Sequence, residues 1–257
     1  MGTLSYELQD QIAVLTIQSP PANALSSKLL RDLSVKLDAI EHENTAKAIV
    51  IKGEGKFFSA GADIKEFTSF QNSSDYQSLS EEGQNLFDRM ESFSIPIIAA
   101  IHGAALGGGL ELAMACHIRI VTESAKLGLP ELNLGIIPGF AGTQRLPQYV
   151  GGPKAYEMIL TGDPISGTEA QAFGLANRVV ADDNLVEEAM NLAKRIAAKS
   201  KPTINQVMKL VPYAKTTQFA EGVKEEARAF GEIFGSEDAK EGVRAFIEKR
   251  KPNFQDK

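Results

Sequence analysis

Two glutamates, each beside a glycine-rich turn, are the residues in this sequence best suited to proton transfer. Glu111 follows the run Gly-Gly-Gly-Leu at 107–110, and Glu131 opens a segment that ends in Pro-Gly at 138–139. Two carboxylates that face one small space can divide acid and base roles when their surroundings push their pKa values apart. Glycines beside them let backbone N–H groups approach a substrate closely. The pattern predicts proton-transfer chemistry next to an anion that backbone amides stabilise.

The glycine run at 107–109 lies between an apolar strand-like segment and an apolar helix-like segment. Unpaired N–H groups at such a helix start carry partial positive charge and can stabilise a developing oxyanion. Glu111 falls one helical turn beyond Gly108. The helix N-terminus should favour the ionised form of Glu111, which suits a base. The alternative is a close-packed strand–helix turn with a capping-type glutamate.

A second turn, at 57–65, follows another apolar strand-like run. Gly61 allows an unusual backbone turn that could present the N–H of Ala62 to a ligand. The alternative is a strand-ending turn whose two phenylalanines pack in the core.

Glu131 is held in a third segment, between Pro130 and Pro138. A carboxyl fixed beside apolar residues should have its pKa raised by desolvation, which suits a proton donor. The alternative is a surface acid that pairs with Lys126 or Arg145.

The remaining reactive residue types do not form a recognisable centre. His42 is expected on a solvated helix end, His102 is expected to satisfy a turn and His117 is expected to be structural. The three share no metal-ligand spacing with each other or with Cys116. The sequence contains no nucleophile elbow, no Walker loop and no dinucleotide fingerprint, because residue 112 is leucine where that fingerprint needs glycine. We therefore expect no metal and no cofactor.

Composition narrows the class of protein. The chain has 257 residues, 43% hydrophobic and 23% charged, with a net charge of -6. An acidic balance gives no support to nucleic-acid binding. A single cysteine rules out an intrachain disulfide and fits a reducing compartment. No signal peptide is evident, and charged and glycine residues interrupt the apolar stretch 95–121, so we expect no membrane partner and a cytoplasmic location, with a processed mitochondrial matrix form as the alternative.

Apolar periodicity indicates the elements that must position these turns. Strands are predicted at 12–17, 48–51, 95–101, 118–121 and 179–180, and a helix capped by Ser26 is predicted to bury Leu29, Leu30, Leu33, Leu37 and Ile40. Residues 68–78 are predicted to be a mobile loop before a helix over about 79–93. Continuous apolar strands separated by helices indicate an α/β fold with a mostly parallel sheet. The chain becomes nearly all helical after about residue 140, so we divide it into a core at 1–195 and a helical region at 196–257.

In their order along the chain, these motifs resemble the crotonase (enoyl-CoA hydratase/isomerase) family. The resemblance covers essentially the whole chain. It is carried by the segments 21–25 (PANAL), 59–63 (SAGAD), 107–109 (GGG), 142–146 (GTQRL) and 237–252. One departure is His117, where the family often has an aspartate that is usually structural.

The resemblance implies a spiral of ββα units with a helical C-terminal trimerisation region, usually assembled as a homohexamer that is a dimer of trimers. It implies an acyl-CoA thioester as the ligand, with coenzyme A as part of the substrate. Glu111 and Glu131 match the two catalytic glutamates, and Ala62 and Gly108 match the oxyanion-hole N–H groups. The substrate- and CoA-binding positions match Ala22, Ala24, Ala60, Asp63, Ile64, Lys65, Gly107, Gly139, Phe246 and Lys249.

Because both glutamates are present, the resemblance favours hydration of trans-2-enoyl-CoA to 3-hydroxyacyl-CoA in fatty-acid β-oxidation. In that reaction Glu111 would accept a proton from water and Glu131 would deliver one to C2. The alternatives are a Δ3,Δ2-enoyl-CoA isomerase, which generally manages with one glutamate, or another acyl-CoA enzyme of the family. A non-enzymatic RNA-binding role would need a basic stripe that the net charge does not suggest.

Overall fold

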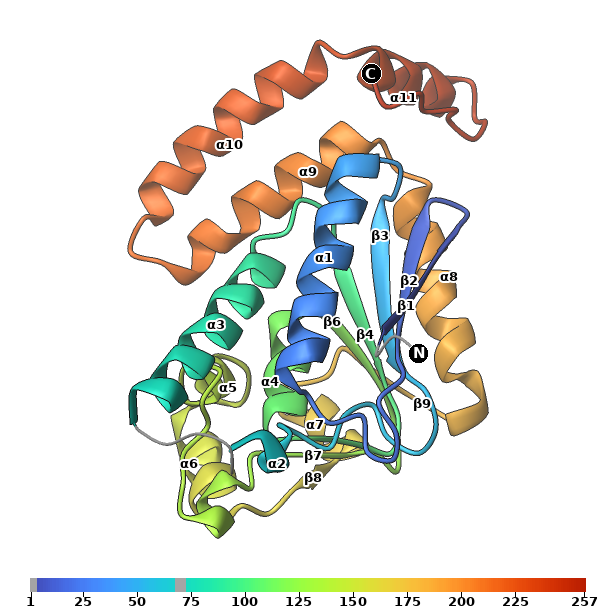
Figure 1. The fold of residues 1–257 in the computed structure, drawn as a ribbon. Helices are drawn as coiled ribbons and strands as arrows, with labels where there is room; N and C mark the ends of the chain where they lie inside the picture. Colours follow the sequence, from blue (N-terminus) through green and yellow to red (C-terminus); the bar gives the residue numbers. More distant parts are fainter. Residues whose placement is uncertain (1–3, 68–72) are drawn as a thin grey trace.

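The computed structural model describes residues 4–67 and 73–257, and a six-stranded sheet lies at its centre (Figure 1). The strand order is β1-β2-β3-β4-β6-β9, with β1 antiparallel to β2 and every later pair parallel. The strands are β1 Leu4–Gln9, β2 Ile12–Ile17, β3 Ala48–Gly53, β4 Ile97–Ile101, β6 Ile118–Thr122 and β9 Arg178–Val180. The predicted mostly parallel sheet is confirmed.

Helices cover both faces of this sheet, which explains why its central strands are apolar on both sides. One face packs against α8 (Leu185–Ala197) through Leu185, Ala189 and Ala193. The other face packs against α1 (Ser27–Glu43), α3 (Ser73–Glu91) and α4 (Gly108–Ala115). The larger core lies on this second face, and it surrounds the helix that carries Glu111.

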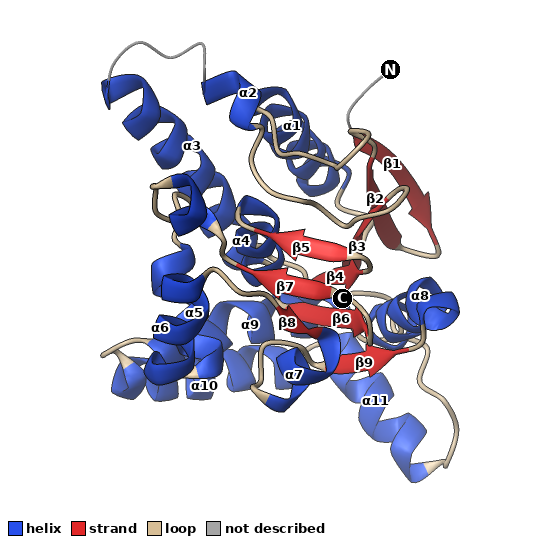
Figure 2. Ribbon diagram, turned by 90° about the horizontal axis from the view of Figure 1, so that it is seen from below, coloured by secondary structure: helices blue, strands red, loops and turns tan. Residues whose placement is uncertain are grey.

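A second, three-stranded sheet lies beside the first and was not predicted (Figure 2). Its strands are β5 Ala104–Leu106, β7 Lys126–Gly128 and β8 Ile165–Ser166, in the order β5-β7-β8. Strands of two or three residues are too short to show an alternating pattern in sequence. Their effect on the site is large, because β5 leads directly into the turn at 107–109.

Local sequence signals explain several elements well. The side chain of Ser26 accepts a hydrogen bond from the N–H of Leu29, which confirms the predicted cap of α1. All five apolar residues predicted on its buried stripe are buried. Asn44 ends the helix in the left-handed conformation, a conformation that asparagine tolerates better than most residues.

The prediction of a mobile loop at 68–78 is wrong from Ser73 onward, because α3 begins there. Residues 68–72 lie outside the described part of the chain. Serine and asparagine suggested a loop because they compete with helix in isolation. Here, buried apolar residues later in the same helix, such as Phe87 and Met90, pack into the core and extend order toward its start.

The remaining elements are helices that lie between and after these strands in the chain. They are α2 Ile64–Phe67, η1 Glu131–Leu134, α5 Gly142–Val150, α6 Gly152–Thr161, α7 Gly167–Ala172, η2 Asp182–Asn184, α9 Lys201–Leu210, η3 Val211–Lys215, α10 Phe219–Phe234 and α11 Glu237–Ile247. Figure 1 shows α10 lying across α9, with α11 at the end of the molecule far from α2. Within the ranges described, none of these helices combines the length and apolar content needed to cross a bilayer.

Candidate active site

The three glycines at the start of α4 each lie against a different segment of the site. A Cβ atom on Gly107 would lie 2.9 Å from Glu131 Oε1, and one on Gly109 would lie 2.3 Å from the carbonyl oxygen of Ser59. A Cβ on Gly108 would lie 3.3 Å from the ring of Phe140. At Gly109 the clash is with main chain, so only glycine fits there, whereas at Gly107 and Gly108 a Cβ would displace the side chains of Glu131 and Phe140.

Two backbone N–H groups meet at this convergence. The nitrogen of Ala62 would lie 3.4 Å from a Cβ on Gly108, so the two turns are in close contact. Ala62 forms a parallel bridge with Leu25 in which Gly61 O and the N–H of Asp63 make the hydrogen bonds. This pairing turns the N–H of Ala62 away from Leu25. The N–H of Gly108 lies in the first turn of α4, where helices leave donors unpaired.

The segment at 22–25 supports the turn that carries Ala62. The carbonyl of Ala22 accepts the N–H of Ala60, and the side chain of buried Asn23 donates to the carbonyls of Glu54 and Phe57. Asn23 lies in the PANAL segment, and the sequence alone did not indicate a role for it. Its contacts explain why an amide suits this position: it donates to two carbonyls and accepts from a third residue's N–H at once.

Glu111 is almost fully buried, at 1% exposure, in the first turn of α4. Its Oε1 accepts two backbone hydrogen bonds, at 2.8 Å from Phe140 N and 2.7 Å from Gly142 N. These two donors could not be predicted from the sequence, because they lie 29 and 31 residues further along the chain. With Oε1 occupied, Oε2 is the oxygen left to meet a substrate water.

Glu131 begins the short helix η1 and is 9% exposed. Its Oε2 is buried and has no hydrogen-bond partner within the described ranges. A buried carboxyl oxygen without a partner carries a desolvation cost, and such groups concentrate where a ligand completes them. The alternative in which Glu131 pairs with Lys126 or Arg145 on the surface is wrong, because Glu131 is buried and Arg145 pairs instead with Asp88 and Glu91.

Burial changes the ionisation of both carboxyls, and the charge of Glu131 also acts on Glu111. Burial, then the charge of Glu131, raises the pKa of Glu111 to about 7, against the N–H groups of Gly142 and Phe140. Burial also raises the pKa of Glu131, as predicted. The expectation that the helix N-terminus would keep Glu111 ionised is wrong in direction, because desolvation and a like charge outweigh the main-chain donors.

The structure places most other predicted binding residues around this convergence. Ala24, Ala60 and Asp63 lie on the two segments joined by the Leu25–Ala62 bridge, and Ile64 begins α2 with 45% of its surface exposed. Lys65 also lies in α2, but its side chain is outside what the structure describes. Gly139 directly precedes Phe140, and its carbonyl accepts hydrogen bonds from Ser80 and Gln84.

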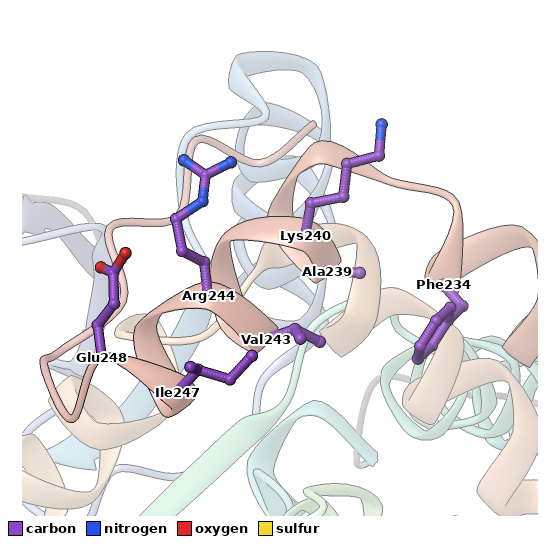
Figure 3. A pocket seen from close by; sticks show the side chains of 7 residues that line it. All are labelled: Phe234, Ala239, Lys240, Val243, Arg244, Ile247 and Glu248. Carbon is purple, nitrogen blue, oxygen red and sulfur yellow. The ribbon is translucent and has the colours of Figure 1, made fainter.

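Phe246 and Lys249 are not brought to the glutamates of their own chain. Phe246 is 84% exposed on α11, which Figure 1 shows far from α2 and β7. The pocket in this region lies between α10 and α11, where Phe234, Val243 and Ile247 give it an apolar wall (Figure 3). Lys240 and Arg244 of α11 also line this pocket and add positive charge to it.

The histidines that contact the site segments are structural. The Nδ1 atom of His117 accepts the N–H of Ile97, and its Nε2 lies 3.1 Å from the carbonyl of Glu91. His102 Nε2 lies 2.9 Å from the carbonyl of Gly55. Across residues 4–67 and 73–257, no group of three or more His, Cys, Asp or Glu side chains is placed to hold a metal ion.

Comparison with known proteins agrees with this geometry. The family model described as enoyl-CoA hydratase/isomerase matches residues 7–257, and the chain belongs to this family. It is 57% identical over 256 residues to a probable enoyl-CoA hydratase of Bacillus subtilis, covering 99% of each chain. It is 40% identical to a crotonyl-CoA hydratase of Syntrophomonas wolfei over 96% of each chain.

A solved structure supports the same assignment of the fold. The enoyl-CoA hydratase of Bacillus anthracis superposes with a TM-score of 0.94 at 34% identity, covering 99% of this chain and all of the other. The expected crotonase-type α/β fold is therefore confirmed.

Proposed function

We propose that this protein is an enoyl-CoA hydratase that adds water across the C2=C3 bond of trans-2-enoyl-CoA thioesters. The observation that carries the proposal is that two buried carboxyls lie beside the turns that carry the N–H groups of Ala62 and Gly108. Glu111 has one oxygen fixed by main-chain donors, and Glu131 has a buried oxygen with no partner in the described part of the chain. The relatives named above as hydratases support the same reaction.

In this proposal the thioester oxygen accepts hydrogen bonds from the N–H groups of Ala62 and Gly108. A water molecule lies between the two carboxyls. Its oxygen bonds to C3 while one of its protons passes to Glu111. The C=C electrons move into an enolate whose oxygen the two N–H groups stabilise, and the proton of Glu131 then bonds to C2.

The proton balance closes after each turnover. The product keeps the hydroxyl at C3 and gains the former Glu131 proton at C2, so one proton must return from Glu111 to Glu131 through solvent. Each positioned acid or base should contribute about 10²–10⁴-fold to the rate. Losing one oxyanion donor should cost about 3–4 kcal/mol of barrier.

We propose further that the active form is a homohexamer, a dimer of trimers, in which α11 contributes Phe246 and Lys249 to the CoA site of a neighbouring copy. Supporting this, Phe246 is exposed, and Figure 1 shows its helix, α11, far from α4, the helix that carries Glu111. The division into a core at 1–195 and a helical region at 196–257, and a role in β-oxidation, also stay predictions.

The reaction can be tested by following the absorbance of the conjugated thioester with 2-enoyl-CoAs of graded chain length. Hydration removes the conjugation, so we expect the absorbance to fall and a product heavier by one water to form. Parallel assays with 3-enoyl-CoA separate the isomerase alternative, since an isomerase would instead increase that absorbance. No turnover of any 2-enoyl-CoA would refute the proposal.

A further inference from the structure

The turn whose N–H groups bind Glu111 is held by three side chains, which donate to its carbonyl groups. The turn consists of Phe140, Ala141 and Gly142, and Ala141 adopts a left-handed backbone conformation with φ of +69°. L-residues rarely adopt this conformation, because their Cβ crowds the following carbonyl oxygen. A left-handed residue between two others can aim successive N–H groups at one anion, as they are aimed here at Glu111 Oε1.

Each peptide unit of this turn has its carbonyl fixed on the side away from Glu111. The unit that ends in the N–H of Phe140 has its carbonyl on Gly139, which accepts 2.5 Å and 2.9 Å hydrogen bonds from Ser80 and Gln84 of α3. The unit that ends in the N–H of Gly142 has its carbonyl on Ala141, which accepts the N–H of Arg145 at 2.9 Å.

The peptide unit between these two is held by the guanidinium of Arg145. Its Nη1 donates to the carbonyl of Phe140 at 3.0 Å, and its other nitrogens reach Glu91 at 3.1 Å and Asp88 at 2.5 Å. Arg145 is only 4% exposed, whereas the side chain of Asp88 is 68% exposed. An ion pair with an exposed partner contributes little by itself. The hydrogen bond to Phe140 is therefore the contact that best explains a buried arginine here.

We propose that Ser80, Gln84 and Arg145 form a positioning clamp that holds the Phe140–Gly142 turn against Glu111 and so fixes the orientation and charge of the base. The three residues do not touch Glu111, so they act through the turn. The proposal rests on the proposed hydration, in which Glu111 is the base. It also links α3 to the catalytic carboxyl through Gly139.

The clamp should affect ionisation as well as geometry. The charged groups that act on Glu111 are Glu131, which raises its pKa, and Arg145, which lowers it. Asp88 and Glu91 of α3 face Arg145. Removing Arg145 would take away a positive charge and loosen two main-chain donors, and both changes favour the protonated carboxyl. The base would then ionise at a higher pH.

The test compares Arg145→Gln with Arg145→Lys and with a matched control, Arg119→Gln. Arg119 is also buried. Its guanidinium donates to the main-chain carbonyls of Ala113, Cys116 and Leu175, and none of these hydrogen bonds among the described residues reaches the Phe140–Gly142 turn. We expect kcat for crotonyl-CoA to fall about 10–100-fold in Arg145→Gln, with KM changed less than about threefold. The acid limb of the pH profile should move up by about half a pH unit or more.

Arg145→Lys keeps the charge but loses the planar fork, so its limb should move less. The milder double variant Ser80→Ala, Gln84→Leu tests the α3 side without emptying a buried charged site, and should lower kcat by about 3–10-fold. Arg119→Gln should leave the acid limb of the pH profile in place, even if it changes thermal stability.

A second readout needs no substrate. Infrared difference titration follows the buried carboxyl directly, and Glu111→Gln identifies its band. We expect the band to titrate at higher pH in Arg145→Gln than in the wild type. A kcat of Arg145→Gln within about twofold of wild type would overturn the clamp. So would a lower kcat in which the acid limb and the Glu111 infrared band stay where they are in wild type, as expected for Arg119→Gln. If the wild type hydrates no 2-enoyl-CoA but the band still moves, the clamp stands and the proposed reaction falls.

Discussion

The end of the molecule that carries the glutamates and the C-terminal end that carries α10 and α11 are built in opposite ways. Every residue of α4 is buried, and the site turns are joined by main-chain hydrogen bonds. By contrast, α10 buries only Ala229, and large apolar side chains on both C-terminal helices are exposed, among them Phe219, Phe230, Phe234, Val243, Phe246 and Ile247. The first region is packed within one chain, and the second has the surface of a region that needs a partner.

This difference teaches where changes should act. Substitutions among the buried turns should change the chemical step, because atoms there have no room to adjust. Substitutions on the C-terminal helices should change assembly and CoA binding while the chemical step survives.

The largest effect is expected from Glu131→Gln. The amide cannot deliver a proton to C2, so hydration of crotonyl-CoA should fall by about 10²–10⁴-fold. Calorimetry should show that acyl-CoA still binds, because the N–H groups of Ala62 and Gly108 are untouched. Glu157→Gln, on the exposed face of α6, is the control and should keep its activity. Near wild-type turnover in Glu131→Gln would reject the role of this carboxyl.

The next largest effect concerns stability and pH. The pKa of Glu111 is raised from 4.5 to about 7 in the folded protein, so the folded state binds more protons than the unfolded state between these values. The contribution of Glu111 to stability should therefore be fully present below pH 4.5 and should be lost as pH rises through 7, by about 3 kcal/mol for this buried group. Denaturant melts of wild type and Glu111→Gln across this window measure the difference.

The matched control for this titration lies in the C-terminal region. Arg250 lowers the pKa of partly buried Glu241 to about 2, so the contribution of Glu241 to stability changes only below pH 4.5. Glu241→Gln should therefore follow the wild-type trend between pH 4.5 and 7. A Glu111→Gln variant that also follows the wild-type trend would contradict the assigned environment of Glu111.

Gly107→Ala should disturb Glu131 directly. The new Cβ would lie 2.9 Å from Glu131 Oε1, at a residue whose φ is +51°. We expect kcat to fall about 10–100-fold through displacement of the carboxyl. Gly151→Ala has a similar positive φ with no atom within 4 Å of the added Cβ, so it carries the backbone strain alone. Equal kcat in the two variants would show that Glu131 tolerates the displacement.

On the C-terminal side, replacing Phe230 and Phe234 together with serine should weaken assembly. These rings stack at 5.5 Å on the exposed face of α10, and a neighbouring copy would bury them. Sedimentation velocity should show at least about tenfold weaker association. An unchanged assembly would place the interface elsewhere.

The smallest effect is expected from Phe246→Ala. If this ring covers CoA in a neighbouring copy, its loss should raise KM about 3–10-fold and leave kcat unchanged. Steady-state kinetics at several protein concentrations measure both constants. A fall in kcat with unchanged KM would contradict a purely binding role.

The sequence predicted the parts of the fold whose signals are local and long. The stripe of α1 and the apolar runs of β3 and β4 are continuous patterns, so their elements were placed correctly. Strands as short as β8, with two residues, carry no period and were missed. The start of α3 was missed because its polar residues are ordered by packing that lies further along the helix.

The site shows the same division. Both glutamates and the glycine turns stand out in the sequence because acidic residues and runs of glycine are unusual beside buried apolar segments. The donors to Glu111 could not be predicted, since main-chain N–H groups carry no sequence signature. Arg145 was considered only as a partner for Glu131, because its true contact is a carbonyl on the turn it helps to hold. The pKa of Glu111 depends on burial and on Glu131, which only the fold brings together.

The central claim is that two carboxyls add water and a proton across one C=C bond. Hydration of crotonyl-CoA in heavy water, with mass spectrometry and NMR of the product, tests it most directly. The account predicts a 3-hydroxyacyl-CoA that has gained one heavy water and carries one deuterium at C2. A product of unchanged mass, or one with its new hydroxyl but no deuterium at C2, would contradict it.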